Sequence, residues 1–171
     1  MMSVTELFGE DVIQARMREV GAAIRRDAGD SEVFLIGILK GSSVFLADLL
    51  RAIPGPVHYE WVNVIVDVAD TETAEATEID FLTQFSMQGR HIYVLKDIVT
   101  SGIIETYLLT QFRERDPASL HLVALLDCPG ERTIEIACQH AVFTTERNRF
   151  VGYGLEFGNR YANLPFIATL G

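Results

Sequence analysis

Cysteine is scarce in this chain of 171 residues, which contains only Cys128 and Cys138. Two isolated thiols cannot form the framework of a disulfide-stapled protein, and their spacing is not that of a zinc site. Histidine is equally sparse, with four residues scattered along the sequence. We therefore predict two inert thiols in a reducing compartment and no zinc centre.

Positive charge is also in short supply. The chain has 14 lysine and arginine residues against 24 aspartate and glutamate residues, a formal net charge of −10. A protein that binds duplex nucleic acid needs a basic face, so we expect no nucleic-acid partner. Anionic small molecules stay possible as ligands, because backbone amides and Mg2+ can both bind phosphate.

Long apolar runs are missing as well. No run approaches the roughly 18 residues of a membrane-spanning helix, and residues 1–6 lack the basic and apolar regions of a signal peptide. We therefore expect no membrane partner and predict a cytoplasmic location. The length suits one domain, predicted to span residues 1–171, that buries about two thirds of its unfolded surface.

Apolar runs of strand length alternate with stretches of helical periodicity. Strands are predicted at 33–39, 57–68, 91–95 and 120–126, with further short strands at 138–143 and 150–154. Helices are predicted at 3–27, 44–53 and 103–113, and the acidic segment 67–80 is predicted to be a solvated loop. This alternation predicts an α/β fold with a parallel core sheet flanked by helices.

The segment that says most about chemistry runs from Val94 to Gly102. A buried strand reaches Asp97, a turn with hydroxyl side chains follows, and a helix begins after Gly102. Amides at a helix N-terminus bind anions, and Thr100 and Ser101 add hydroxyl donors. Asp97 lies where open α/β sheets bind ligands and could hold ribose hydroxyls. Judged by spacing alone, an ordinary capped helix explains the segment equally well.

The same segment resembles the 5-phosphoribosyl-1-pyrophosphate (PRPP) binding motif of type I phosphoribosyltransferases. Other stretches are similar to the hypoxanthine-guanine branch of that family and occur in the same order: residues 35–41, 45–53, 89–94, 125–127, 151–156 and 163–165. The resemblance covers about residues 10–170. It implies a type I phosphoribosyltransferase-like fold, in which a small hood from segments near the termini accompanies the parallel core sheet.

The resemblance also implies an activity. Enzymes of this family transfer a phosphoribosyl group from Mg2+-bound PRPP to a purine or related base and release pyrophosphate, a reaction of purine salvage. The chain is accordingly expected to use Mg2+ and to bind PRPP and a purine-like base. The family also implies a homodimer or a homotetramer.

Site residues follow from the resemblance position by position. The expected PRPP and phosphate contacts are Leu39, Lys40, Gly41, Asp97, Ile98, Thr100, Ser101 and Gly102. Lys40, Asp97 and Thr100 take the catalytic positions, Cys128, Phe150 and Val151 the base-binding positions, and Asp97 and Glu156 the metal-binding positions. The family also implies a cis peptide bond before Lys40.

Several positions depart from the family pattern. Lys96 and Thr100 replace two acids, and Cys128 replaces a lysine that reads the purine 6-oxo group. Ile104 replaces a phosphate-binding threonine, and Ala162 replaces an arginine. Together these changes argue against ordinary hypoxanthine or guanine salvage and leave the acceptor base open. They also leave an alternative open, a catalytically degenerate homologue that binds a nucleotide or phosphate ligand as a sensor or assembly subunit.

Overall fold

The computed structural model describes residues 3–67, 75–146 and 149–171. Its core is a six-stranded sheet in the order β4-β3-β2-β5-β6-β7. The strands are β2 (Val33–Ile38), β3 (Val57–Asp67), β4 (Glu75–Phe81), β5 (His91–Val99), β6 (Ser119–Asp127) and β7 (His140–Thr144). Five of them pair in parallel, and β4 runs antiparallel to β3 at one edge. The predicted parallel sheet is therefore present.

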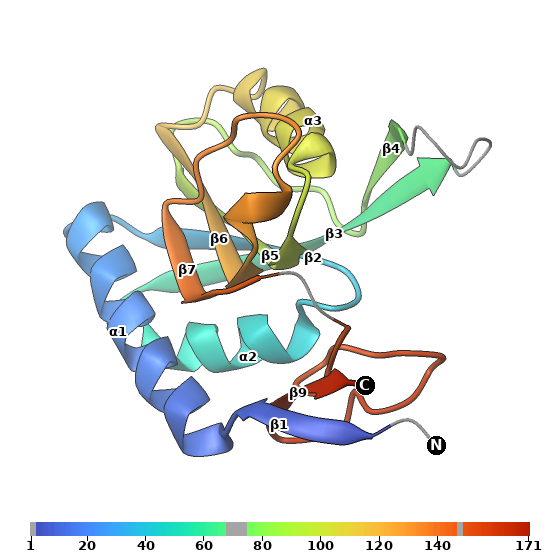
Figure 1. Ribbon diagram of the computed structural model, residues 1–171. Helices are drawn as coiled ribbons and strands as arrows, with labels where there is room; N and C mark the ends of the chain where they lie inside the picture. The colour runs from blue at the N-terminus through green and yellow to red at the C-terminus, as the bar shows by residue number, and fades with distance from the viewer. Residues whose placement is uncertain (1–2, 68–74, 147–148) are drawn as a thin grey trace.

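Helices cover both faces of the sheet (Figure 1). Helices α1 (Glu10–Ala28) and α2 (Ser43–Ala52) lie on one face, and α3 (Ile103–Arg113) lies on the other, near the short 3-10 helix η1 (Pro129–Glu131). Every residue of β2 is buried, because its side chains enter two cores in alternation. Leu35 belongs to the core beneath α1 and α2, whereas Phe34 and Ile36 belong to the core beneath α3. A strand covered on both faces explains its unbroken apolar sequence.

A second sheet joins the two ends of the chain. Strands β1 (Val4–Phe8), β9 (Ile167–Leu170) and β8 (Phe150–Val151) form it in that order, next to α2 in Figure 1. This sheet is the hood that the family resemblance implied. The predicted helix over 3–27 is therefore wrong for its first residues, because β1 pairs with β9 at the far end of the chain. Local periodicity cannot reveal such a distant partner.

The acidic segment 67–80 is the other main correction. Residues 68–74 of the predicted loop lie outside the described residues, but Glu75–Phe81 forms β4 and pairs with β3. Glu78 and Asp80 are exposed, while Ile79 and Phe81 pack against the core beneath α3. The alternation of a strand was thus present in the sequence, masked by the number of acids.

Smaller differences concern the ends of strands. β5 continues past Leu95 to Val99, so Asp97 lies within the strand rather than at its end. β7 begins at His140, and β8 ends at Val151. Within the described ranges, no helix is long and apolar enough to cross a membrane.

Candidate active site

A cavity of about 280 Å³ opens where the loop after β2, the end of β5 and the chain around β8 meet. The residues that line it are Lys40, Gly41, Asp97, Ile98, Phe150, Gly154, Leu155 and Glu156. Six of these eight are residues that the sequence predicted for the site. They come from three distant parts of the chain, which only the fold brings together.

Close backbone packing holds the loop after β2 in this cavity. A Cβ atom added to Gly41 would lie 1.9 Å from Oδ2 of Asp97, so only glycine fits against that carboxylate. On another side, a Cβ atom on Gly154 would lie 3.1 Å from the carbonyl oxygen of Gly41, and Gly154 itself has a φ of +90°. The loop is therefore fixed between β5 and the chain that follows β8.

The peptide bond between Leu39 and Lys40 is cis, as the family resemblance implied. Ser43 donates a hydrogen bond from its hydroxyl to the Lys40 carbonyl, which fixes the direction of that group. Among the residues that the structure describes, none accepts a hydrogen bond from the amides of Lys40 and Gly41. These two amides are available to an anionic ligand.

Residues 99–102, called the phosphate turn below, have their carbonyl groups held from outside by Arg132. The guanidinium donates to the carbonyl oxygen of Thr100 at 2.6 Å and to that of Val99 at 3.1 Å. Its other nitrogen forms an ion pair with Asp127 at the end of β6. Both charged side chains are largely buried, so this ion pair is shielded from solvent.

The rest of the phosphate turn is held in the same way. The amides of Thr133 and Ile134 donate to the carbonyl oxygen of Ser101 at 3.0 and 3.1 Å. Gly102 has a φ of +84°, and a Cβ atom there would lie 2.7 Å from Cγ2 of Ile136. No acceptor for the amides of Ser101 and Gly102 occurs in the described part of the chain. With its carbonyls occupied and these amides free, the turn has the chemistry of an anion-binding site at the start of α3.

Two carboxylates and Lys40 line the cavity, and Lys96 is paired with one of these carboxylates. Lys40 Nζ lies 2.8 Å from Glu156 Oε1, and Lys96 forms an ion pair with Asp97. The described residues include no group of three metal-ligating side chains. Mg2+ in phosphate sites needs only one or two carboxylates, because phosphate oxygens and water complete its shell. Asp97 and Glu156 therefore fit the donor set that Mg2+ requires.

A buried acid lies behind the phosphate turn. Glu105, in the first turn of α3, is only 4% exposed. Burial raises the pKa of its carboxyl group, with Asp97 adding to the shift and Lys96 and Arg132 opposing it. Sequence reasoning missed both Glu105 and Arg132. An acid in the first turn of a helix is commonplace, and nothing local connects Arg132 to a turn some thirty residues earlier in the chain.

Not all predicted residues line the cavity. Thr100, Ser101 and Gly102 form the separate phosphate turn, and Leu39 is half-buried beside the cavity loop. Of the predicted base contacts, Phe150 lines the cavity, but Cys128 and Val151 are fully buried and do not. Base binding by these three residues stays a prediction. In the present arrangement, the Cys128 thiol is not accessible to a base.

The two cysteines do behave as predicted for inert thiols. Neither forms a disulfide bond, and Cys128 is buried while Cys138 is half-buried. Burial raises the pKa of the Cys138 thiol to about 12, so that thiol stays protonated at neutral pH. Cys128 is fully buried, and neither thiol has the exposed, acidic character of a reactive cysteine.

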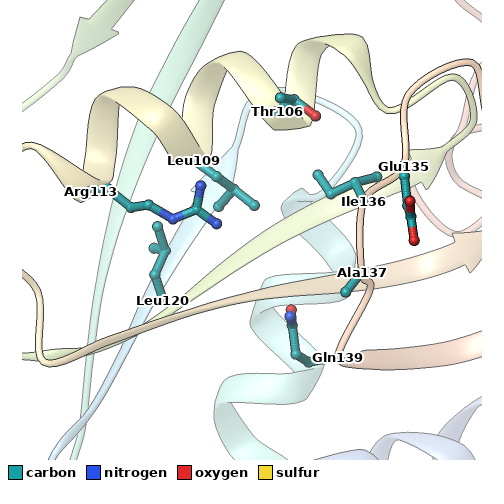
Figure 2. A pocket seen from close by; sticks show the side chains of 8 residues that line it. All are labelled: Thr106, Leu109, Arg113, Leu120, Glu135, Ile136, Ala137 and Gln139. Carbon is teal, nitrogen blue, oxygen red and sulfur yellow. The ribbon is translucent and has the colours of Figure 1, made fainter.

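A separate cavity of about 170 Å³ lies beyond the phosphate turn, between α3 and the chain after η1 (Figure 2). Figure 2 shows the Arg113 side chain extending across it from α3, opposite Ile136 and Gln139. None of the predicted site residues lines this cavity. Its wall at residues 135–137 continues the segment that holds the phosphate turn, so it lies behind the candidate site rather than in it.

Comparisons with known proteins agree with this geometry. Residues 4–157 match the family model described as phosphoribosyl transferase domain. The hypoxanthine-guanine phosphoribosyltransferase of Bacillus subtilis is 34% identical over 164 residues, which cover 96% of this chain and 91% of that protein.

Solved structures give the same result. A hypoxanthine-guanine phosphoribosyltransferase from Bacillus anthracis, with a HEPES molecule in its active site, superposes with a TM-score of 0.89 at 30% identity, covering 100% of this chain and 99% of that chain. The hypoxanthine phosphoribosyl transferase of Trypanosoma cruzi gives a TM-score of 0.88 at 31% identity, with 98% and 91% covered. The chain therefore belongs to the type I phosphoribosyltransferases, in the hypoxanthine-guanine phosphoribosyltransferase family.

Proposed function

We propose that the chain is an enzyme that transfers the 5-phosphoribosyl group of PRPP to a ring nitrogen of a purine base and releases pyrophosphate. The observation that carries this proposal is the phosphate turn, whose carbonyls are occupied and whose amides are free in a chain of this family. The comparisons give no support to the alternative of a catalytically degenerate homologue, because the named relatives are phosphoribosyltransferases.

The substrate would extend from the phosphate turn to the loop after β2. The free amides of Ser101 and Gly102, with the Thr100 hydroxyl, would hold its 5′-phosphate. Asp97 would accept hydrogen bonds from the ribose hydroxyls, with Ile98 beside it in the cavity wall. On the other side of the ribose, Lys40 would neutralise pyrophosphate together with its own amide and that of Gly41, and Leu39 would lie beside them on the other side of the cis peptide bond.

Asp97 and Glu156 are the residues that would hold Mg2+. When bound, the ion supplies positive charge to the leaving pyrophosphate. The protein's own part is to orient the ribose and to exclude water from the anomeric carbon, which becomes electron-poor as the bond to pyrophosphate lengthens. Lys40, which is paired with Glu156 in the structure, would turn toward pyrophosphate as that group acquires charge.

The base would lie next to the ribose, against the Phe150 ring and near Val151. Hypoxanthine and guanine are the first candidates, since the relatives carry those names. Two replacements bear on the choice, because Cys128 offers no ammonium group for a 6-oxo oxygen and Thr100 offers no carboxylate for a ring proton. These replacements predict weaker discrimination between purines than a polar reader gives.

Assembly and location stay predictions. A homodimer or homotetramer is expected from the family, and the Trypanosoma cruzi structure was solved in a study of how its C-terminal region affects oligomeric state. We retain the cytoplasm as the predicted location. Size-exclusion chromatography with light scattering measures the assembly directly.

The deciding experiment is a panel of bases with PRPP and Mg2+, scored by pyrophosphate release. Hypoxanthine, guanine, xanthine, adenine and a non-purine heterocycle make up the panel. Release with at least one purine supports the proposal, whereas PRPP binding without release from any base would revive the degenerate homologue.

Asp97→Asn should weaken PRPP binding by about tenfold, because an amide is a poorer acceptor than a carboxylate. Unchanged affinity would show that the ribose lies elsewhere.

A further inference from the structure

Lysine is the rarest basic residue of this chain. The sequence contains only Lys40 and Lys96, against twelve arginines. Both lysines lie at the candidate site, and each forms an ion pair with a carboxylate that lines the cavity. The two carboxylates are Asp97 and Glu156, which are also the residues proposed to hold Mg2+. Each carboxylate therefore already has a positively charged protein side chain beside it.

The two lysines differ in how firmly they are held. The Lys40 side chain is 69% exposed, so it can leave Glu156 at little cost. The Lys96 side chain is only 20% exposed, and its partner Asp97 is 22% exposed. Lys96 also acts electrostatically on the buried carboxyl group of Glu105, in the first turn of α3. Its ammonium group is therefore fixed near both Asp97 and the start of the helix that follows the phosphate turn.

A fixed ammonium group beside Asp97 changes what a divalent cation can do there. Like charges repel, so Lys96 opposes the approach of Mg2+ to Asp97. The same ammonium group supplies positive charge where a substrate with several phosphates must be neutralised, in a chain whose net charge is −10. An ammonium group has three donors, so it keeps donors for a substrate oxygen beyond its contact with Asp97.

We propose that Lys96 is a substrate-binding residue whose ammonium group, held beside Asp97, neutralises part of the negative charge of PRPP. PRPP would then bind with little dependence on Mg2+. This inference rests on the proposed function and changes one part of it: with Lys96 as the cation at Asp97, Glu156 rather than Asp97 would be the main protein ligand of Mg2+. Mg2+ then acts chiefly at the pyrophosphate end, on the side of Glu156 and the exposed Lys40 side chain. Binding and turnover should consequently differ in their need for the metal.

Calorimetry of PRPP binding in Mg2+ and in EDTA tests the proposal without relying on activity. For the wild-type protein, removal of Mg2+ should raise the Kd of PRPP by less than about tenfold. Lys96→Gln should raise the Kd in EDTA by about tenfold to a hundredfold, the usual weight of a charge-assisted contact, and make binding strongly dependent on Mg2+. Lys96→Arg keeps the charge and should retain most of the metal-independent binding.

The control is Arg18→Gln, which removes one positive charge from an exposed position of α1. It should leave both Kd values unchanged, because its effect is only on net charge. If wild type, Lys96→Gln and Arg18→Gln show the same ratio of Kd values with and without Mg2+, the inference is wrong. Wild-type protein that binds no PRPP even with Mg2+ would instead disprove the proposed function.

Lysine acetylation gives a second readout that does not depend on how the variants fold. Brief treatment with an N-hydroxysuccinimide ester of acetate modifies amines, and Lys40 and Lys96 fall in different peptides for mass spectrometry. PRPP in EDTA should slow the acetylation of Lys96 several-fold relative to the protein alone. Protection of Lys40 alone would place the ribose-phosphate away from Lys96 and overturn the inference.

Discussion

Polar side chains gather at both ends of strands β5, β6 and β7, but they meet different surroundings. At the amino ends, the Tyr93 ring stacks on that of His121 with centroids 4.8 Å apart, and His140 Nε2 lies 2.8 Å from Asp27 of α1. At the carboxyl ends, Asp97 lines a cavity, and the phosphate turn has free amides. One end is closed by ring stacking and a helix, and the other is open to a ligand.

Chain direction accounts for the difference. In a parallel sheet every strand leads out of its carboxyl end into a loop or a helix start, where amides have no partner. At the amino ends, α1 packs on the sheet, and its last turn brings Asp27 to β7. The same strands can therefore bury polar groups at one end for packing and present them at the other for binding.

Arg132 offers the strongest test of how the open end is maintained. Arg132→Met leaves Asp127 as a buried charge without its partner and releases the carbonyls of the phosphate turn. We expect the free energy of unfolding to fall by about 3 kcal/mol and the KM for PRPP to rise more than kcat falls. Urea denaturation and initial rates measure the two effects.

Two further variants separate charge from geometry in that result. Asp127→Asn combined with Arg132→Met removes both charges and should recover part of the stability but not the KM. Arg132→Lys keeps a charge but loses the planar fork that reaches two carbonyls, so its KM should lie between those of wild type and Arg132→Met. A normal KM in Arg132→Met would mean that the turn keeps its shape unaided.

Gly41 tests the fit of the cavity itself. Gly41→Ala would place a Cβ atom 1.9 Å from Oδ2 of Asp97, so the loop after β2 or the carboxylate must move. A displacement near 1 Å in an active site can cost about a hundredfold, and we expect a loss of that size in kcat/KM. Gly130→Ala is the matched control, because no atom lies within 4 Å of its added Cβ. Equal losses in both variants would contradict the close fit.

Much of the closed part of the molecule could be predicted from local patterns. Apolar runs located β2, β5 and β6, and periodicity located α3 with its observed bounds. The errors involve distant partners: β1 is a strand only because β9 pairs with it, and β4 only because it lies along β3. Propensity yields to tertiary pairing at such edges.

The open end could be predicted only in part, and mainly from the family resemblance. Family resemblance located Lys40, Asp97 and Glu156, and the fold brings them to one cavity. Resemblance could not indicate that Lys96 pairs with Asp97, because that residue departs from the family pattern. It also gave no sign of Arg132, whose role depends on a return of the chain after β6 to the turn after β5. Contacts of this kind leave no periodic signal.

The Tyr93 hydroxyl tests the closed end. It is fully buried, and no described residue forms a hydrogen bond with it. Burial raises its pKa, and Asp27 adds to the shift. Because an unpaired buried hydroxyl is costly, Tyr93→Phe should raise the free energy of unfolding by about 1 kcal/mol. Tyr153→Phe is the contrasting control: its hydroxyl donates to Asp48, so stability should fall by about 1 kcal/mol. A loss in both would mean that Tyr93 has a partner such as buried water.

The smallest expected effect is a pH dependence at the same closed end. Burial lowers the pKa of His121 below its ordinary value of 6.5, with His140 and His91 adding to the shift and Asp27 opposing it. The unfolded chain therefore binds a proton at this residue more readily than the folded one, and the folded state loses stability as pH falls below 6.5. His121→Phe keeps a ring against Tyr93 but cannot titrate, so its stability should decline less between pH 6.5 and 5 than that of wild type. Parallel curves for the two proteins, measured by urea denaturation, would assign the acid sensitivity to other groups and leave ring stacking as the only role of His121.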